Sequence, residues 1–252
     1  MLRLGWITAT RRPEDRMVAL LQFFGVGSVA AWRAQYEQPL AALRAAPSHP
    51  CKPGALAAWL RRAEVEASAL PTAAYQADAF RATLPTLRAL TRNPDPHTFI
   101  PALTEACAAH GVAVVLIPAP RGCPVSGATR WLTPKKAMLA LSLRHGTSDS
   151  LWFSFFHEAA HLVLHGKRLH FFELEGALTN AHGAEADAFA RDLLIPPAHA
   201  AALATVADDA DQIVALADRL GVAPAIVLGR LQHERRIAWN RHAHLRPRYR
   251  WR

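Results

Sequence analysis

The spacing of hydrophobic residues changes once along the chain, close to the sequence Asn93-Pro94-Asp95-Pro96. Before this point, residues 13 to 94 carry apolar positions at helical spacing, in alanine- and leucine-rich segments such as ALAAWLRRAEVEASAL that Pro, Gly and Ser separate. Two prolines within four residues favour a turn or a short linker. We therefore expect a helical N-terminal region over residues 1–95.

Beyond this linker the pattern alternates between helices and short strands. A helix is expected from Thr98 to His110, and the continuous apolar run VAVVLIP that follows is typical of a buried strand. Two further strands are expected, from Ala128 to Leu132 and from Ala137 to Leu143. A helix from about Ser150 to His165 comes next, with capping residues before it and Gly166 after it.

The last part of the chain predicts three more helices. One contains EADAFARDLL and ends before two prolines, and two amphipathic helices lie within residues 208 to 234. Ala217, Gly221 and Val227 have spacings reminiscent of a helix-turn-helix, although a packed helical hairpin is the simpler interpretation. The pattern as a whole predicts a mostly helical α+β fold with a small sheet. After the N-terminal region, we expect a domain with the small sheet over residues 96–205. A helical hairpin with a basic tail is expected over residues 206–252.

Composition indicates a folded protein without a membrane-spanning segment. The chain has 252 residues, of which 51% are hydrophobic, and this is enough for a buried core. No apolar stretch approaches the roughly 20 residues that span a bilayer, and the N-terminal sequence lacks a secretory apolar run. Cys51, Cys107 and Cys123 match neither a disulfide framework nor a Cys-x-x-Cys metal site. We therefore expect a cytoplasmic protein with no membrane partner.

The net charge of +9 is concentrated at one end of the chain. The segment from Arg230 to Arg252 contains eight arginines and a single acid, Glu234. Such a tail attracts nucleic acids, because each neutralised phosphate releases counterions, and interspersed aromatic rings can stack on exposed bases. The alternative is a solvated end of an arginine-rich protein. The nucleic-acid candidates are Arg235, Arg236, Arg241, Arg246, Arg248, Arg250 and Trp251.

A His-Glu-x-x-His motif, formed by His157, Glu158 and His161, lies within the helix expected at 150–165. Histidines four residues apart share one helix face, so both imidazoles can hold one zinc ion while Glu158 acts as general base on its water. Glu185, on the following helix, is the candidate third ligand. Asp187 is about 200 degrees further around that helix, and is either a substitute ligand or a partner that orients a histidine.

Other histidines near the motif do not extend it. The longer metzincin motif needs Gly and His at positions occupied by Leu164 and Lys167, so that class is excluded. His165, His170 and His182 are expected to be structural or surface residues, although one of them is a candidate for stabilising an oxyanion.

Cys123 lies in the turn-rich stretch PAPRGCPVSG, on a loop that enters the expected sheet. Thiolates are strong zinc ligands, so Cys123 is a candidate inhibitory ligand that occupies the open zinc position in a resting state. The alternative is an ordinary loop cysteine. If the cysteine is such a latch, its replacement by alanine raises basal proteolysis.

The segments FFHEAAHLVLHG and EADAFARDLLIP resemble the ImmA/IrrE family of zinc metallopeptidases, in which a His-Glu-x-x-His helix is paired with a Glu-Ala-(Asn or Asp)-x-Phe-Ala-x-x-Leu-Leu-x-Pro helix. GVAVVLIP, SGATRWL and SLWFSFFHE are similar to versions of this domain in antitoxin-like transcription regulators. We expect the similarity to cover residues 15 to 250. It implies a zincin-like fold, with His157, His161 and Glu185 as metal ligands and Glu158 as the catalytic residue.

The resemblance further implies a narrow-specificity endopeptidase. Its substrate would be a partner helix-turn-helix repressor, and its cleavage would induce stress, mobile-element or anti-phage genes, with single-stranded DNA or DNA damage as a signal. No convincing helix-turn-helix precedes residue 15, which favours cleavage of a separate protein. The alternative is a DNA-binding regulator or antitoxin with a non-proteolytic peptidase-like domain that uses residues 230 to 252 as its working surface.

Overall fold

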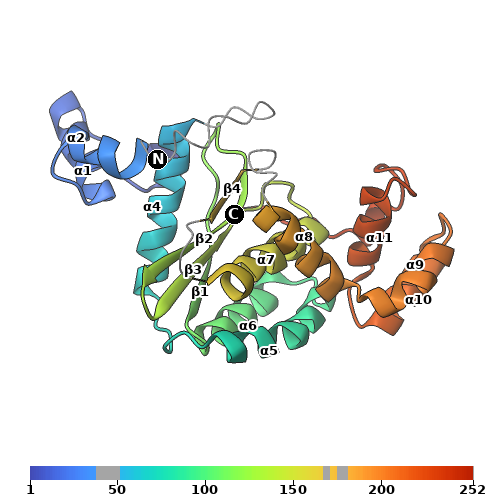
Figure 1. Cartoon of the computed structure of the whole chain (residues 1–252). Helices are drawn as coiled ribbons and strands as arrows, with labels where there is room; N and C mark the ends of the chain where they lie inside the picture. Colours follow the sequence, from blue (N-terminus) through green and yellow to red (C-terminus); the bar gives the residue numbers. More distant parts are fainter. Residues whose placement is uncertain (38–51, 167–170, 175–180, 252) are drawn as a thin grey trace.

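A four-stranded mixed sheet organises the computed structural model, which describes residues 1–37, 52–166, 171–174 and 181–251 (Figure 1). Its strands are β1 (Val112–Leu116), β2 (Val125–Thr133), β3 (Lys136–Leu141) and β4 (Phe171–Leu174), in the order β1-β3-β2-β4. β1 and β3 are parallel, whereas β2 pairs antiparallel with β3 and with β4. A two-residue turn joins β2 to β3, so Thr133 pairs with Lys136.

The two faces of the sheet belong to two separate hydrophobic clusters, because successive side chains of a strand point to opposite faces. Ala113, Val115 and Ala140 pack with helix α4 (Pro53–Ala69), whose Trp59 Nε1 donates a hydrogen bond to Ile117 O at 3.0 Å. Val114 and Leu139 instead belong to the cluster that contains helix α7 (Ser148–Ala160). Figure 1 shows α4 and α7 on opposite sides of the strands.

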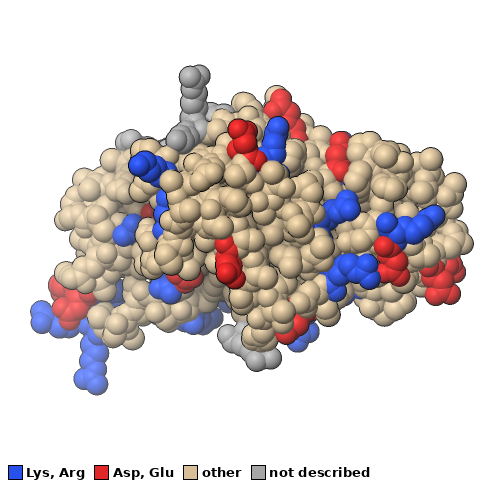
Figure 2. All heavy atoms as spheres, turned by 90° about the horizontal axis from the view of Figure 1, so that it is seen from below, with Lys and Arg blue, Asp and Glu red and all other residues tan. Residues whose placement is uncertain are grey.

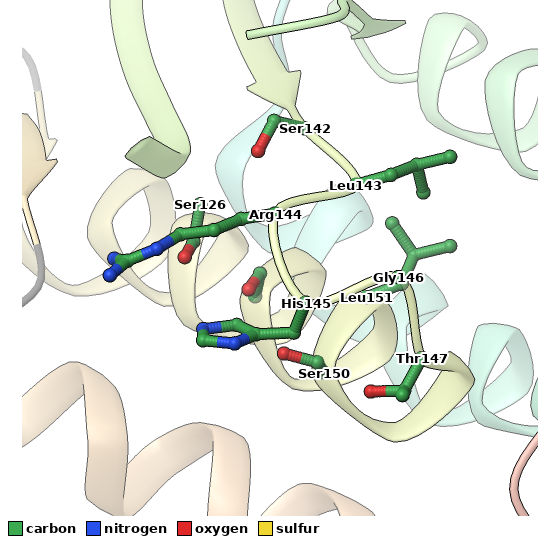
Figure 3. A pocket seen from close by; sticks show the side chains of 10 residues that line it. Ser126, Ser142, Leu143, Arg144, His145, Gly146, Thr147, Ser150 and Leu151 are labelled. Carbon is green, nitrogen blue, oxygen red and sulfur yellow. The ribbon is translucent and has the colours of Figure 1, made fainter. Parts of the chain in front are cut away.

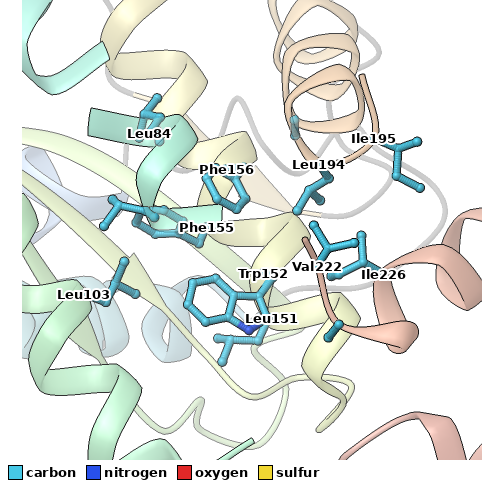
Figure 4. Close-up of a cluster of buried hydrophobic side chains, with 14 of the residues drawn as sticks. Leu84, Leu103, Leu151, Trp152, Phe155, Phe156, Leu194, Ile195, Val222 and Ile226 are labelled. Atoms are coloured by element: carbon cyan, nitrogen blue, oxygen red, sulfur yellow. The ribbon is translucent and has the colours of Figure 1, made fainter. Parts of the chain in front are cut away.

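Helix α7 is buried on nearly all sides because most of its residues are large and apolar. Trp152, Phe155 and Phe156 form a connected aromatic group, with centroid separations from 5.0 to 6.4 Å. Figure 4 shows these rings among side chains from four other helices. The surrounding helices are α5 (Ala77–Leu87), α6 (Pro96–Ala108), α8 (Ala181–Leu194) and α11 (Pro224–His233).

The remaining elements are helices and short helical turns. They are η1 (Leu2–Leu4), α1 (Pro13–Phe24), α2 (Val29–Trp32), η2 (Arg33–Glu37), η4 (Arg88–Arg92), the π-helical turn η5 (His161–His165), η7 (Pro197–His199), α9 (Ala200–Thr205), α10 (Ala210–Leu220) and η8 (Ala243–Leu245). Arg61 of α4 ties the N-terminal helices to the sheet layer, since its Nε donates to Phe23 O at 2.9 Å and its Nη1 lies 3.3 Å from Glu64.

The fold class expected from the sequence is confirmed: the protein is mostly helical, with a small sheet. The three strands expected from the sequence are present as β1, β2 and β3. The helix that contains EADAFARDLL is α8, and it begins at Ala181, four residues before that segment. Strand β4 was not expected, because four residues give too short a pattern. The division of the chain into three parts, with boundaries at residues 95 and 205, stays a prediction. Side chains from all three proposed parts, such as Phe80, Leu103 and Leu228, share the hydrophobic cluster around α7.

The C-terminal segment is attached to the start of α7. Ser148 N donates to Pro247 O at 3.0 Å, and Tyr249 N donates to Gly146 O at 2.9 Å. Arg246 Nε lies 3.1 Å from the Asp149 carboxylate in a largely buried ion pair. The N-cap residue Thr147 makes no side-chain capping bond. The backbone of residues 247 to 249 therefore does part of the work that a capping side chain does in other helices.

Tyr249 is the hydrophobic anchor of this segment. Its side chain is buried, and its ring packs on Phe99 with a centroid separation of 5.5 Å, next to Trp152. Its hydroxyl is buried without a hydrogen-bond partner among the described residues. Burial raises the pKa of Tyr249 from the ordinary value of 10.0 to about 12, because the ionised phenolate would lose its hydration.

We predict that Tyr249→Ala lowers the free energy of unfolding by about 3 kcal/mol, because a large cavity opens beside Phe99. Tyr249→Phe should change it by less than about 1 kcal/mol, since the hydroxyl has no bond to lose. Urea unfolding of both variants measures the difference. A Phe variant as unstable as the Ala variant would contradict this account.

The same residue predicts an alkaline pH dependence. The folded pKa lies above the unfolded one, so the protonated phenol stabilises the fold fully below pH 10, and this contribution is lost as the pH rises from about 10 to about 12. The melting temperature should fall less across this window in Tyr249→Phe than in the wild type. Equal slopes would show that Tyr249 ionises as readily in the folded protein as in the unfolded chain.

Candidate active site

The His-Glu-x-x-His motif lies on the last turns of α7, inside the protein. His157 is 4% exposed, Glu158 is 1% exposed and His161 is 2% exposed. Polar side chains at this depth need partners, because their transfer from water otherwise costs several kcal/mol. The contacts of each residue therefore indicate what the site is built to hold.

The two motif histidines point their Nε2 atoms at each other across 3.0 Å. Two imidazole ligands of one tetrahedral zinc ion, each about 2.0–2.1 Å from the metal, have nitrogens about 3.3 Å apart. The observed separation is close to this value. Their convergence follows from the four-residue spacing on a helix, as expected from the sequence.

Asp187 of α8 contacts the other ring nitrogen of His157. The distance from His157 Nδ1 to Asp187 Oδ1 is 2.8 Å, so Nδ1 carries the hydrogen and donates it to the carboxylate. In the neutral imidazole this leaves a lone pair on Nε2, the atom that faces His161. Of the two roles left open for Asp187, this contact is the orienting one.

Glu185 contacts His165, one turn beyond the motif. His165 Nε2 lies 2.8 Å from Glu185 Oε2, and His165 Nδ1 lies 3.1 Å from His161 Nδ1. With Nε2 of His165 donating to the carboxylate, its Nδ1 is an acceptor, and the Nδ1–H of His161 is the donor. The Nε2 atom of His161 is then also left with a lone pair.

Asp187 and Glu185 thus favour the tautomers of His157 and His161 in which Nδ1 carries the hydrogen. In these tautomers the lone pairs of the two Nε2 atoms face each other across 3.0 Å. Two lone pairs repel each other unless a cation lies between them, so the donor set of His157 and His161 fits a metal ion. Within the described part of the chain, no third side chain joins them to form a group of three ligands. Glu185 lies against His165 instead of on this point, and its side chain is 60% exposed.

A widened helical turn shapes the end of the site. Residues His161–His165 form a π-helical turn, and outside donors bind the carbonyl groups that such a turn displaces. Tyr75 Oη donates to Leu162 O at 3.1 Å, and Trp131 Nε1 donates to Gly166 O at 3.2 Å. Neither aromatic residue was expected at the site, because neither lies near the motif in sequence.

Glu158 lies on the face of α7 that contacts the sheet, beside Gly127 of β2. A small pocket lies near the start of α7 and is lined in part by Ser126, Ser150 and Ser154 (Figure 3). Arg144 and His145 line the same pocket, and Arg144 Nη1 donates to Pro124 O at 2.8 Å. Glu158 is not among the residues that line it.

Residues 125–232 match the family model of the M78 peptidases, described as the IrrE N-terminal-like domain. This part of the chain is an IrrE N-terminal-like domain of the ImmA/IrrE family. M78 is a metallopeptidase family, so the match supports a peptidase of the metal-dependent kind. The matched range is narrower than the expected residues 15 to 250. No curated protein matches the chain.

The fold does not bring Cys123 to the face of the sheet on which the motif lies. Cys123 is buried in the cluster that α4 covers, whereas His157 on α7 and His161 on η5 lie on the opposite face. This placement gives no support to the inhibitory-ligand hypothesis, which stays a prediction. Burial raises the pKa of Cys107 to about 12, so that thiol is unreactive. Cys51 and His170 lie outside the described residues.

The C-terminal arginines divide into two groups. Arg236, Arg241 and Arg246 have partners within the chain: Arg236 donates to the carbonyls of residues 203, 204 and 206, Arg241 pairs with an aspartate, and Arg246 pairs with Asp149. Arg235, Arg248, Arg250 and Trp251 are exposed. Figure 2 shows basic and acidic side chains interspersed on the face that it presents, over the α9–α11 region as well.

The two helices around Gly221 pack into the same core. Ala217 and Val227 are fully buried, and Gly221 ends α10 in the left-handed conformation. The hairpin therefore has a clear structural role next to α7. The nucleic-acid role of this part of the chain stays a prediction.

We predict that Asp187→Ala weakens zinc affinity by about 10- to 100-fold, because His157 loses the partner that fixes its tautomer. Asp187→Asn should lose less, since its amide oxygen can still accept the Nδ1 hydrogen. Competition with a chromogenic chelator measures both affinities. The matched control is Asp192→Ala on the same helix, whose carboxylate accepts a hydrogen bond from Arg191, and this variant should bind zinc as the wild type does.

Proposed function

We propose that the protein is a zinc-dependent endopeptidase in which Glu158 is the general base. The observation that carries this proposal is the approach of two buried imidazole nitrogens, Nε2 of His157 and Nε2 of His161, to 3.0 Å, with a buried carboxylate on the residue after His157. The contacts of Asp187 and Glu185 favour the tautomers in which both nitrogens carry lone pairs, and such a pair suits a cation. The family match supports the same class of enzyme.

His157 and His161 would hold the metal, and Glu185 is the proposed third ligand. Its exposed side chain has room to turn from His165 towards the two Nε2 atoms. When bound, zinc supplies Lewis acidity, which polarises a peptide carbonyl and acidifies a water molecule. Three protein ligands leave one position open for substrate and water.

The proton transfers belong to Glu158. Its carboxylate takes a proton from the attacking water and later delivers a proton to the nitrogen of the departing amine. Asp187 keeps the His157 ring in place during both steps.

The sheet offers a place for an extended substrate. Among the described strands β4 is the outermost beside β2, and its Glu173 pairs with Gly127, the strand residue that contacts Glu158. A substrate segment that added to the free edge of β4 would run alongside the proposed metal centre. We propose that this segment belongs to a helix-turn-helix repressor, whose cleavage induces stress or anti-phage genes in the cytoplasm.

Glu158→Gln is predicted to keep zinc stoichiometry and abolish cleavage, because the amide keeps the shape of the side chain and loses its basicity. The measurement is gel-based cleavage of the repressor encoded beside this gene, with zinc content determined on the same preparations. His157→Ala should lose both zinc and activity. Cleavage by a zinc-loaded Gln variant would refute the role of Glu158.

A DNA-binding regulator without proteolysis is the second candidate, favoured by the exposed Arg248, Arg250 and Trp251. The same three residues would serve the peptidase if single-stranded DNA activates it. No single helix in the described ranges is long and apolar enough to cross a membrane.

We predict that Arg248→Gln with Arg250→Gln lowers the salt dependence of single-stranded DNA binding by about 0.7 in slope for each lost phosphate contact. Fluorescence anisotropy with an oligothymidine at several salt concentrations measures this slope. The matched control is Arg241→Gln, whose charge is already paired with Asp208. An unchanged slope in the double variant would remove the tail from DNA binding.

A further inference from the structure

Gly127 is a buried glycine near the start of β2, paired with Leu141 of β3 and with Glu173 of β4. The pairing of β2 with β4 shifts register between Val125 and Gly127, and Gly127 is not among the glycines with positive φ. A glycine inside a strand often marks such an irregularity or the close approach of another group. Position 127 therefore does not need glycine for a left-handed conformation, and the space around it shows a close approach as well.

The group that approaches is the side chain of Glu158. A Cβ atom at position 127 would lie 2.6 Å from Glu158 Cγ, 2.7 Å from Oε1 and 2.9 Å from Cδ, and these are its three nearest atoms. Ordinary van der Waals contact begins at 3.4 Å. The missing side chain of Gly127 thus leaves a slot, and the carboxylate of Glu158 lies in it.

The slot matters because Glu158 is buried and attached to a fixed helix. Its side chain is 1% exposed, so a displaced carboxylate has no route to bulk water. The helix cannot retreat either, since Phe155 and Ala159 on either side of Glu158 are fully buried in the core. An added methyl group would therefore push the carboxylate itself, by about 1 Å.

We propose that Gly127 is a positioning residue for Glu158, which fixes the general base by leaving room on β2 for its side chain. The proposal rests on the function assigned to Glu158 above. A displacement of 1 Å lowers the rate of a reaction by about 100-fold when the displaced group must meet a reacting atom. Gly127→Ala should therefore lower kcat by about 100-fold and leave KM for the repressor unchanged.

A double-mutant cycle tests the slot without any assay of activity. Gly127→Ala should lower the melting temperature by about 3 °C in the wild-type background. In a Glu158→Ala background, where the slot is empty, the same change should leave the melting temperature unchanged or raise it. The control is Gly54→Ala on α4, where a Cβ meets nothing within 4 Å, and it should behave alike in both backgrounds.

A second readout separates positioning from mere packing. In protein loaded with Co²⁺, the visible absorption of the metal reports on the groups around its water, so Gly127→Ala should shift the spectrum in the direction of Glu158→Ala, and Gly54→Ala should not. Equal thermal effects of Gly127→Ala in both backgrounds, or a wild-type spectrum and kcat, would overturn the proposal. If the wild type neither binds Co²⁺ nor cleaves the repressor, the proposed function fails, whereas the thermal cycle still decides whether the slot exists.

Discussion

The structure depends on the burial of α7 between the sheet and four other helices. Trp152, Phe155 and Phe156 supply the apolar contacts that hold it there. The same burial carries two histidines and a glutamate into the interior, where each must find a partner or a cation. Stability and chemistry are therefore coupled: the helix is anchored by its apolar side chains, and its polar ones are confined to a single arrangement.

Two carboxylates on α8 complete this arrangement from the outside. The side chains of Asp187 and Glu185 remain more than half exposed, while the side chains of the histidines that they contact are buried. Asp187 accepts the hydrogen of His157 Nδ1, and Glu185 accepts that of His165 Nε2, next to His161. Both contacts favour the tautomers in which the Nε2 atoms of His157 and His161 carry lone pairs. The site is thus prepared for a cation by contacts that are themselves mostly in water.

The C-terminal segment, residues 230 to 252, has a structural role that its sequence does not indicate. As a sequence, residues 230 to 252 are a basic tail suited to polyanions. In the structure, Tyr249 and Arg246 attach this segment to the first turn of α7, and Arg236 binds the carbonyl groups that end α9. Deleting the whole segment would disturb the active-site helix as well as any DNA contact, so single charge changes at exposed positions are the sharper probe.

The motif was predictable because its geometry is local. His157 and His161 are one helical turn apart, so their imidazoles converge on any helix that carries them. The apolar runs of β1 and β3 likewise indicate buried strands without reference to the rest of the chain. The pairing of this helix with the one that carries Glu185 is not local, and it was expected only because of the family resemblance. Gly127 left one usable signal, an isolated glycine inside a strand pattern, which is typical of a close backbone approach.

What the sequence determined by itself was the class of fold, the longer helices and strands, and the convergence of the two motif histidines, since these depend on neighbours within a few residues. Only the tertiary structure decided that Asp187 orients His157, that Glu185 lies against His165, that Gly127 makes room for Glu158, and that Cys123 belongs to the far face of the sheet. Each of these joins residues from different elements. Such contacts are set by how helices and strands pack on one another, and no local period encodes that packing.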